Sequence, residues 1–300
     1  MHAVDLGSIL NGMAMDNQTD HQRPVGLIAG GGVLPFALAD SLLAQGRTPV
    51  FIGLKGFCDP RRIANYRHHW FSVGQFGSIM KALRAEGCSD ITFIGNLVRP
   101  SFKDLRLDWH AVRILPQILQ GLRGGDNHTL LATARVFEDG GFRVLGLRDL
   151  APGLLMPSGC LTRTQPDAAS LNDAAKGQDV LRAISPFDVG QAVVVIDGHV
   201  VSIEDIAGTD VLLARIKALR ESGRLRAKPG HGVLVKAPKQ GQDLRLDLPA
   251  LGPQTIRGIA EAGLAGIAVM AGHSVVAEPQ AMIEAADTAG IFVIGLDSRP

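Results

Sequence analysis

Short apolar runs alternate along the chain with segments in which apolar residues recur at helical spacing. The runs typical of buried strands are Val25–Ala29, Thr48–Gly53, Asp90–Gly95, Gly141–Gly146, Ala192–Ile196, His199–Glu204, Gly232–Lys236, Gly266–Met270 and Gly290–Gly295. Helical spacing is found between them at Pro35–Ala44, Ser78–Glu86, His128–Asp139, Asp173–Ile184, Val211–Ser222, Thr255–Glu261 and Gln280–Ala289. Strands that alternate with helices predict α/β units built on largely parallel sheets.

The domain organisation follows from breaks in this pattern. A Pro- and Gly-rich stretch around 149–159 separates two halves, and 300 residues suffice for two domains. We expect a disordered leader over residues 1–22 and a Rossmann-like N-terminal domain with a parallel sheet over residues 23–155. A second α/β domain is expected over residues 156–300. Its sheet should be mixed, because Asp197-Gly198 is typical of a hairpin turn between two strands.

Composition excludes several classes of protein. A net charge of +1, two Trp and one Tyr argue against a nucleic-acid binder, which usually carries a basic face or a row of stacking rings. No apolar run approaches the roughly 20 residues of a membrane helix. The three cysteines are scattered and form no CxxC pair, which favours free thiols in a reducing cytoplasm.

The strand Gly232–Lys236 is followed directly by a segment with an unusual mixture of charges. Its polar residues are Lys236, Lys239, Gln242, Asp243, Arg245 and Asp247. Ligands of open α/β sheets bind outside the carboxyl ends of strands, so this segment is the first place to expect chemistry.

These residue types suit a phosphate-bearing substrate. We expect the cations Lys236, Lys239 and Arg245 to neutralise phosphate oxygens. Carboxylates can hold Mg²⁺, which uses one or two of them together with substrate phosphates. A carboxylate can also orient or deprotonate a water molecule. Asp243 and Asp247 are therefore candidate metal ligands and candidate catalytic residues, and the spacing leaves open which of them performs the chemistry.

The glycines Gly30, Gly31 and Gly32 follow the first strand and precede a helix. They can bring the backbone close to a phosphate at the helix N-terminus, or they can simply make a tight turn. The pattern is not a complete GxGxxG, and no acidic residue ends the second strand, which disfavours a dinucleotide site.

Further candidate substrate contacts lie beside other strand ends and helix starts. Asn96 and Arg99 follow the strand Asp90–Gly95, where a guanidinium could grip phosphate or be a plain loop charge. Gly208, Thr209 and Asp210 open a helix and could cradle phosphate or serve as ordinary caps. The last of these candidates is Gln191, which directly precedes a strand.

Six segments in the same order resemble the LpxI family, whose members are UDP-2,3-diacylglucosamine pyrophosphatases. They are Gly30–Pro35, Phe93–Pro100, Asp188–Ala192, Gly208–Asp210, Lys236–Pro249 and Gly263–Val269. The resemblance extends over almost the whole chain beyond the leader. It implies two α/β domains with the ligand between them, a homodimer, and a cytoplasmic enzyme that can lie on the inner membrane. It also implies Mg²⁺-dependent hydrolysis to 2,3-diacylglucosamine 1-phosphate (lipid X) and UMP, with water attacking the sugar-side phosphorus.

The family motif QDxRxDxP falls on Gln242, Asp243, Arg245, Asp247 and Pro249, and the resemblance equates Asp243 with the catalytic aspartate. Lys236 and Lys239 stand in a KAPK stretch where relatives commonly have a KP pair. Two other functions remain as alternatives: an NAD(P)-dependent oxidoreductase, from the glycine-rich opening, and a non-catalytic module that binds a nucleotide sugar or lipid.

Overall fold

A computed structural model describes residues 23–97, 126–239 and 241–297. The predicted leader and Arg99 lie outside the described residues. The chain divides into two units, one ending at Ala151 and one beginning at Pro152, and each is described by itself. Within the described residues, no helix combines the length and the apolar character that crossing a bilayer requires.

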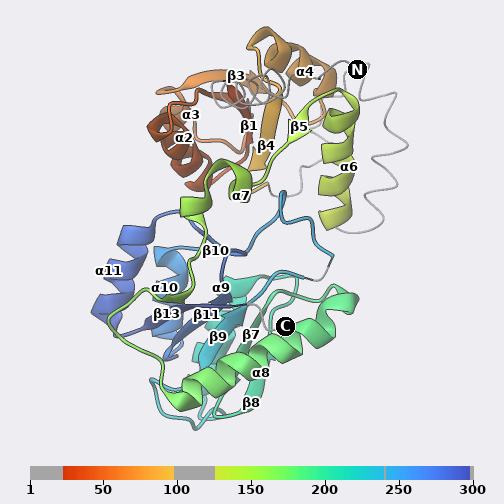
Figure 1. Cartoon of the computed structure of the whole chain (residues 1–300). Helices are drawn as coiled ribbons and strands as arrows, with labels where there is room; N and C mark the ends of the chain where they lie inside the picture. Colours follow the sequence, from red (N-terminus) through yellow and green to blue (C-terminus); the bar gives the residue numbers. More distant parts are fainter. Residues whose placement is uncertain (1–22, 98–125, 240, 298–300) are drawn as a thin grey trace, which may run out of the picture. The chain divides into compact units, whose positions relative to one another are not determined.

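The first unit is an α/β unit on a parallel sheet (Figure 1). Its elements are β1 (Val25–Ala29), α2 (Leu34–Ala44), β2 (Pro49–Leu54), α3 (Pro60–Ile63), β3 (Arg67–Phe71), α4 (Phe76–Ala85), β4 (Asp90–Ile94), α6 (Asp126–Asp139), β5 (Arg143–Val144) and α7 (Leu147–Leu150). The strand order is β3-β2-β1-β4-β5, with every pairing parallel. This order confirms the Rossmann-like prediction, with β1 and β4 at the point where the winding reverses.

The second unit also contains helices and one large sheet. Its elements are η1 (Pro152–Leu154), β6 (Gly159–Cys160), α8 (Ala168–Ile184), η2 (Ser185–Phe187), β7 (Ala192–Ile196), β8 (His199–Ile203), α9 (Thr209–Glu221), β9 (Val233–Lys236), β10 (Ala250–Leu251), α10 (Pro253–Glu261), β11 (Gly266–Met270), β12 (Val275–Val276), α11 (Pro279–Ala289) and β13 (Phe292–Leu296). The main sheet has the order β6-β13-β11-β9-β7-β8. β13, β11 and β9 are parallel, whereas β6, β7 and β8 join through antiparallel pairings, which confirms the predicted mixed sheet.

Alternating residues of this sheet face two different helical layers. Val193, Val195, Val233 and Val235 pack with α8, and their neighbours Val194 and Leu234 pack with α9, α10 and α11 on the other face. Figure 1 shows α8 lying across one face of the sheet. The period of two is the expected signature of a strand buried on both faces.

The hairpin between β7 and β8 has the backbone that its sequence predicts. Asp197 and Gly198 have φ values of 47° and 76°, in the left-handed region that a tight two-residue turn requires. The carboxylate of Asp173 on α8 accepts hydrogen bonds from both turn amides, at 2.9 and 2.6 Å. A helix of one layer therefore fixes the turn of the sheet.

The structure departs from the predicted elements at several places, and the short elements α3, α7, β6, β10 and β12 were not predicted. β3 was not predicted, and β5 is shorter than the expected run Gly141–Gly146. The predicted capping of α9 by Thr209 or Asp210 is wrong, because the helix begins at Thr209 and its N-cap is Gly208, with no side-chain capping bond. Gly208 has φ +85°, which explains why a glycine stands there.

Candidate functional site

The topology of the second unit brings three polar residues together at one edge of its sheet. Two of them, Gln191 and Lys236, were predicted as site residues, and the third, Glu204, was not. β9 ends at Lys236, which pairs with Ala192 at the start of the antiparallel strand β7. On the other side of β7, the amide of Glu204 donates to the carbonyl of Ala192 at 2.8 Å. Gln191, Glu204 and Lys236 therefore lie side by side where β7 begins and where β8 and β9 end.

A chain of hydrogen bonds joins the Lys236 ammonium to the Glu204 carboxylate through Thr209. Lys236 Nζ donates to Thr209 Oγ1 at 3.1 Å, and the same hydroxyl donates to Glu204 Oε1 at 2.5 Å. Thr209 is in this position because α9 starts five residues after Glu204, which directly follows β8. Its hydroxyl proton is committed to Glu204, so Thr209 presents a lone pair to Lys236.

Lys236 is a buried cation. It is 6% exposed, and burial lowers the pKa of its ammonium. The nearby carboxylates of Glu204, Asp210 and Asp247 act in the opposite direction and favour the charged form of Lys236. Among the described residues, the hydrogen bond to Thr209 is the one that holds this ammonium. The remaining N–H donors are therefore available to an anionic ligand.

Gln191 ties the start of β7 to both neighbouring segments. Its amide donates to Glu204 Oε2 at 2.8 Å, and its carbonyl accepts from the amide of Ala237 at 3.0 Å. Its side-chain Oε1 is buried and has no hydrogen-bond partner within the described part of the chain. An orphaned acceptor of this kind at a cluster of charges is a place where a ligand hydroxyl or N–H group would be stabilised.

The loop after β9 is folded on its own side chains. The Lys239 amide donates to Gln242 Oε1 at 3.0 Å, and Gln242 Nε2 donates to Asp247 Oδ2 at 2.5 Å. Lys239 Nζ lies 2.5 Å from Asp188 Oδ1, so this cation has a carboxylate partner before any ligand arrives. Gln242 thus spans the loop and holds the Asp247 carboxylate in place.

Asp243 and Arg245 form a forked ion pair. Arg245 Nε lies 3.1 and 3.2 Å from the two carboxylate oxygens of Asp243, and Nη2 lies 2.7 Å from Oδ2. The hydrogen bond from Arg245 is the main cause that lowers the pKa of Asp243. The amide of Asp247 donates to the carbonyl of Asp243 at 3.3 Å, so a single turn of backbone separates the two aspartates.

The donor set can be compared with the needs of Mg²⁺. In the described ranges, no three acidic, histidine or cysteine side chains gather as a ready metal site. Mg²⁺ does not require one, since it binds through one or two carboxylates plus substrate phosphates and keeps several waters. Each carboxylate has about four lone-pair positions and can share them between protein donors and a metal ion. The residues therefore fit the metal together with a phosphate ligand.

The glycine-rich turn of the first unit is closed by backbone pairing. The amides of Gly30 and Gly31 donate to the carbonyls of Ile94 and Asn96, at 2.9 and 2.8 Å, and the Asn96 amide donates back to Gly31. A Cβ on Gly30 would lie 2.5 Å from the Asn96 carbonyl oxygen. Close approach of two backbones thus explains Gly30 and Gly31, as the tight-turn interpretation predicts. Gly32, with φ +89°, leads into the open first turn of α2.

The structure therefore brings together some predicted site residues of the second unit and leaves others in separate contacts. Gln191, Thr209 and Lys236 share one hydrogen-bonded cluster, and Asp210 and Asp247 contribute to its field. The remaining predicted residues of this unit are Gly208 at the helix start and Lys239, Gln242, Asp243 and Arg245 in the loop. Gly30, Gly31, Gly32 and Asn96 belong to the first unit.

Sequence reasoning missed Glu204 as a site residue. It is 7% exposed, and its carboxylate binds both Thr209 and the backbone of Gln191. The available signal was its place as an acidic residue at the end of the predicted strand His199–Glu204. Asp188, the partner of Lys239, was also missed, although it begins the segment that contains Gln191.

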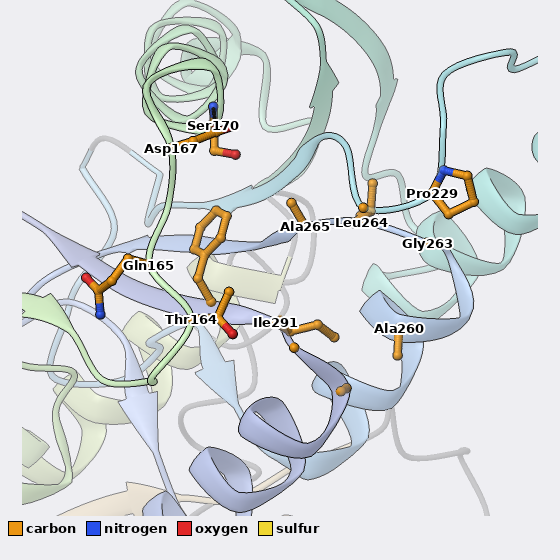
Figure 2. A pocket seen from close by; sticks show the side chains of 14 residues that line it. Thr164, Gln165, Asp167, Ser170, Pro229, Ala260, Gly263, Leu264, Ala265 and Ile291 are labelled. Carbon is orange, nitrogen blue, oxygen red and sulfur yellow. Dashed lines mark hydrogen bonds between the residues drawn. The ribbon is translucent and has the colours of Figure 1, made fainter.

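A pocket of about 370 Å³ lies at the opposite end of the strands of the same sheet, where β11 and β13 begin. Figure 2 shows its lining side chains converging from the start of α8, the Pro229 loop and the end of α10. Its lining includes Ala265, directly before β11, and Phe292, at the start of β13, whereas Lys236 of the charged cluster lies where β9 ends. No predicted site residue lines this pocket. The stronger candidate site is therefore the charged edge, which consists of the cluster of Gln191, Glu204, Thr209 and Lys236 and the loop after β9.

Comparisons with known proteins agree with the resemblance carried by the motifs. The model of the LpxI N-terminal domain matches residues 24–154, and that of the LpxI C-terminal domain matches residues 157–294. The chain is 42% identical over 277 residues to a protein of Caulobacter vibrioides named UDP-2,3-diacylglucosamine pyrophosphatase LpxI. The match covers 92% of this chain and 99% of that relative. The chain therefore belongs to the LpxI family.

Proposed function

We propose that this protein hydrolyses the pyrophosphate of UDP-2,3-diacylglucosamine to 2,3-diacylglucosamine 1-phosphate (lipid X) and UMP. The observation that carries the proposal is the charged edge of the second unit, which lies within the match to the LpxI C-terminal domain. The activity named for the Caulobacter vibrioides relative supports it. The substrate requires cations for its two phosphates and carboxylates for a metal ion or a water, and both kinds of group are present.

The proposed reaction transfers a phosphoryl group to water. The oxygen of a water molecule forms a bond to the sugar-side phosphorus, and the bond from that phosphorus to the bridging oxygen breaks. The bridging oxygen leaves with UMP, and the water loses its protons to the surroundings. The sugar product keeps its 1-phosphate, which now contains the oxygen from water.

Lys236 is the proposed main contact to the pyrophosphate. A buried ammonium that is held by one hydroxyl can place its other donors on phosphate oxygens, and in a site with little water this charge acts strongly. Lys239 and Arg245 add positive charge from the loop. In this proposal they exchange part of their contact with Asp188 and Asp243 for contact with phosphate.

Asp243 and Asp247 are the proposed groups that hold Mg²⁺ and orient the attacking water. Bound Mg²⁺ would neutralise charge on the phosphate oxygens and polarise them toward attack. Arg245 keeps the Asp243 carboxylate ionised and fixed, because it donates to both of its oxygens. Gln242 Nε2 donates to Asp247 Oδ2 and so helps to orient that carboxylate. The buried acceptor of Gln191 is a proposed contact for a hydroxyl or N–H group of the substrate.

The test of this division of roles is Asp243→Asn, which keeps the size of the side chain and removes its charge. We expect UMP release from UDP-2,3-diacylglucosamine to fall by about 100-fold or more, as when one electrostatic group of a phosphoryl or acyl transfer site is removed. Asp179→Asn, at an exposed site on α8, is the matched control. Turnover of D243N within a small factor of the control would refute the role of Asp243.

We further propose that the protein acts as a homodimer in the cytoplasm and contacts the inner membrane peripherally, where its acylated substrate resides. Sedimentation with and without lipid vesicles tests both points. A protein that sediments as a monomer at working concentration would refute the proposed dimer. A protein that does not co-sediment with the vesicles would refute the proposed membrane contact.

A further inference from the structure

We infer that Glu204 is a positioning residue for this reaction: it fixes the Thr209 hydroxyl and the Gln191 backbone, and through Thr209 it holds the Lys236 ammonium in place. The inference rests on the proposed function of the charged edge and adds a residue to it. Glu204 does not contact the substrate phosphates directly, because its negative charge would repel them. Its effect passes through the side chains that it holds.

The contacts of Glu204 account for both of its oxygens. Oε1 accepts from the Thr209 hydroxyl at 2.5 Å, and Oε2 accepts from the Gln191 amide at 2.8 Å. Its own amide donates to Ala192, the residue that pairs with Lys236. A single buried carboxylate therefore connects the ends of β8 and β9, the start of β7 and the first residue of α9.

The direction of the hydrogen bonds is what gives Glu204 its role. A hydroxyl has one proton, and a carboxylate is an acceptor only, so the Thr209 proton must point to Glu204. The Thr209 oxygen is then left as an acceptor for Lys236 Nζ. Without the carboxylate, the hydroxyl can rotate, and Lys236 loses a fixed partner.

A second and independent observation is the fit of the backbone around Glu204. A Cβ added to Gly190 would lie 2.2 Å from the Glu204 carbonyl oxygen and 2.9 Å from the Glu204 Cβ. A glycine is therefore needed for the segment before β7 to approach Glu204 closely enough for the Gln191 amide to bind it. Both the packing of Gly190 and the hydrogen bond of the Gln191 amide therefore place this segment directly against Glu204.

The experiment compares Glu204→Gln, Thr209→Val and Thr209→Ser with the wild-type protein. Glu204→Gln keeps the shape and turns one acceptor into a donor that faces another donor. Thr209→Val keeps the shape and removes the hydroxyl, whereas Thr209→Ser keeps the hydroxyl. Glu221→Gln, at the exposed end of α9, is the control for removal of a carboxylate.

Two readouts are measured on the folded proteins. The first is the rate at which a small amine-acylating reagent modifies Lys236 relative to Lys217, which is exposed and paired with Glu261. The second is the release of UMP from UDP-2,3-diacylglucosamine, as kcat and KM. The first readout needs no substrate, so it decides on Glu204 even if the wild-type protein releases no UMP and the proposed function fails.

We expect E204Q and T209V to raise the relative acylation of Lys236 several-fold and to lower kcat/KM by about 100-fold, the usual effect of a misplaced group. T209S should retain both wild-type values, which a merely structural need for the threonine side chain would not predict. The inference is overturned if E204Q or T209V leaves the acylation of Lys236 at the wild-type rate, or if T209S behaves like T209V.

Discussion

The contact between Gly190 and Glu204 gives a direct prediction for Gly190→Ala. The added methyl group would lie 2.2 Å from the Glu204 carbonyl oxygen and 2.8 Å from its carbonyl carbon. Both atoms belong to the backbone beside β7, so neither can rotate away. Gly190 does not have a left-handed φ, and the expected cost is therefore steric alone.

The magnitude follows from the overlap. Relief to ordinary van der Waals contact, near 3.4 Å, requires the segment before β7 to move by roughly 1 Å, and overpacking of this kind costs about 1–3 kcal/mol. The same movement would pull the Gln191 amide away from Glu204, to which it is bound at 2.8 Å. We expect turnover to fall by about 100-fold, because a displacement near 1 Å has that effect on a positioned site.

Two quantities are measured for each variant: the midpoint of thermal unfolding and the rate of UMP release by the folded protein. Gly153→Ala is the control. A Cβ at Gly153 would meet nothing within 4 Å, so this variant changes glycine to alanine without the overlap. We expect a lower midpoint and slower turnover for G190A than for G153A. Equal midpoints and equal turnover in the two variants would refute the close packing of Gly190 on Glu204.

Three further predictions concern the framework. Asp90→Asn removes a buried carboxylate that binds Arg47 at 2.9 Å and Arg143 at 2.8 Å. It should destabilise the first unit by about 3 kcal/mol, seen as roughly 100-fold faster hydrogen exchange in β1 and β4. Arg220→Met removes donors to four backbone carbonyls and should destabilise the second unit by about 2 kcal/mol in chemical unfolding. Burial raises the pKa of Cys88 to about 12, so this thiol should resist alkylation at pH values near 8 until the protein unfolds.

Each of these has a clear contrary result. An unchanged rate of hydrogen exchange in β1 and β4 of D90N would contradict the proposed stabilisation of the first unit by the Asp90 carboxylate. Arg182→Met, at an exposed i,i+3 pair, is the control for R220M, and equal stability of the two would contradict the role of Arg220. Alkylation of Cys88 in the folded protein as fast as that of the partly exposed Cys160 would contradict its burial.

The central strands could be predicted from the sequence because their signal is local. Runs such as Ala192–Ile196 are apolar at every position, and only a strand buried on both faces between helices requires that. β3, Arg67–Phe71, carries three polar residues and is nowhere fully buried, since it is an edge strand paired only with β2. Its place depends on pairing with β2, the strand before it, and its own residues carry no apolar run that would predict a strand.

The site could be predicted in part for the same reason. Lys236 and Gln191 adjoin predicted strands, and ends of neighbouring strands meet at one edge. Glu204 also adjoins a strand, but a lone carboxylate beside a polar hairpin resembles a surface residue. Its burial arises from Gly190 and Thr209, which approach it only in the folded unit. Likewise, the pairing of Gly31 with Asn96 depends on two strands that lie far apart in sequence.

The central claim is tested most directly by hydrolysis of UDP-2,3-diacylglucosamine in water enriched in heavy oxygen, with Mg²⁺ and with EDTA. Mass spectrometry of the products then locates the oxygen that water supplied. The account predicts UMP release with Mg²⁺ and none with EDTA, heavy oxygen in the 1-phosphate of the sugar lipid, and none in UMP. Heavy oxygen in UMP would contradict attack at the sugar-side phosphorus, and no UMP under either condition would contradict the proposed activity.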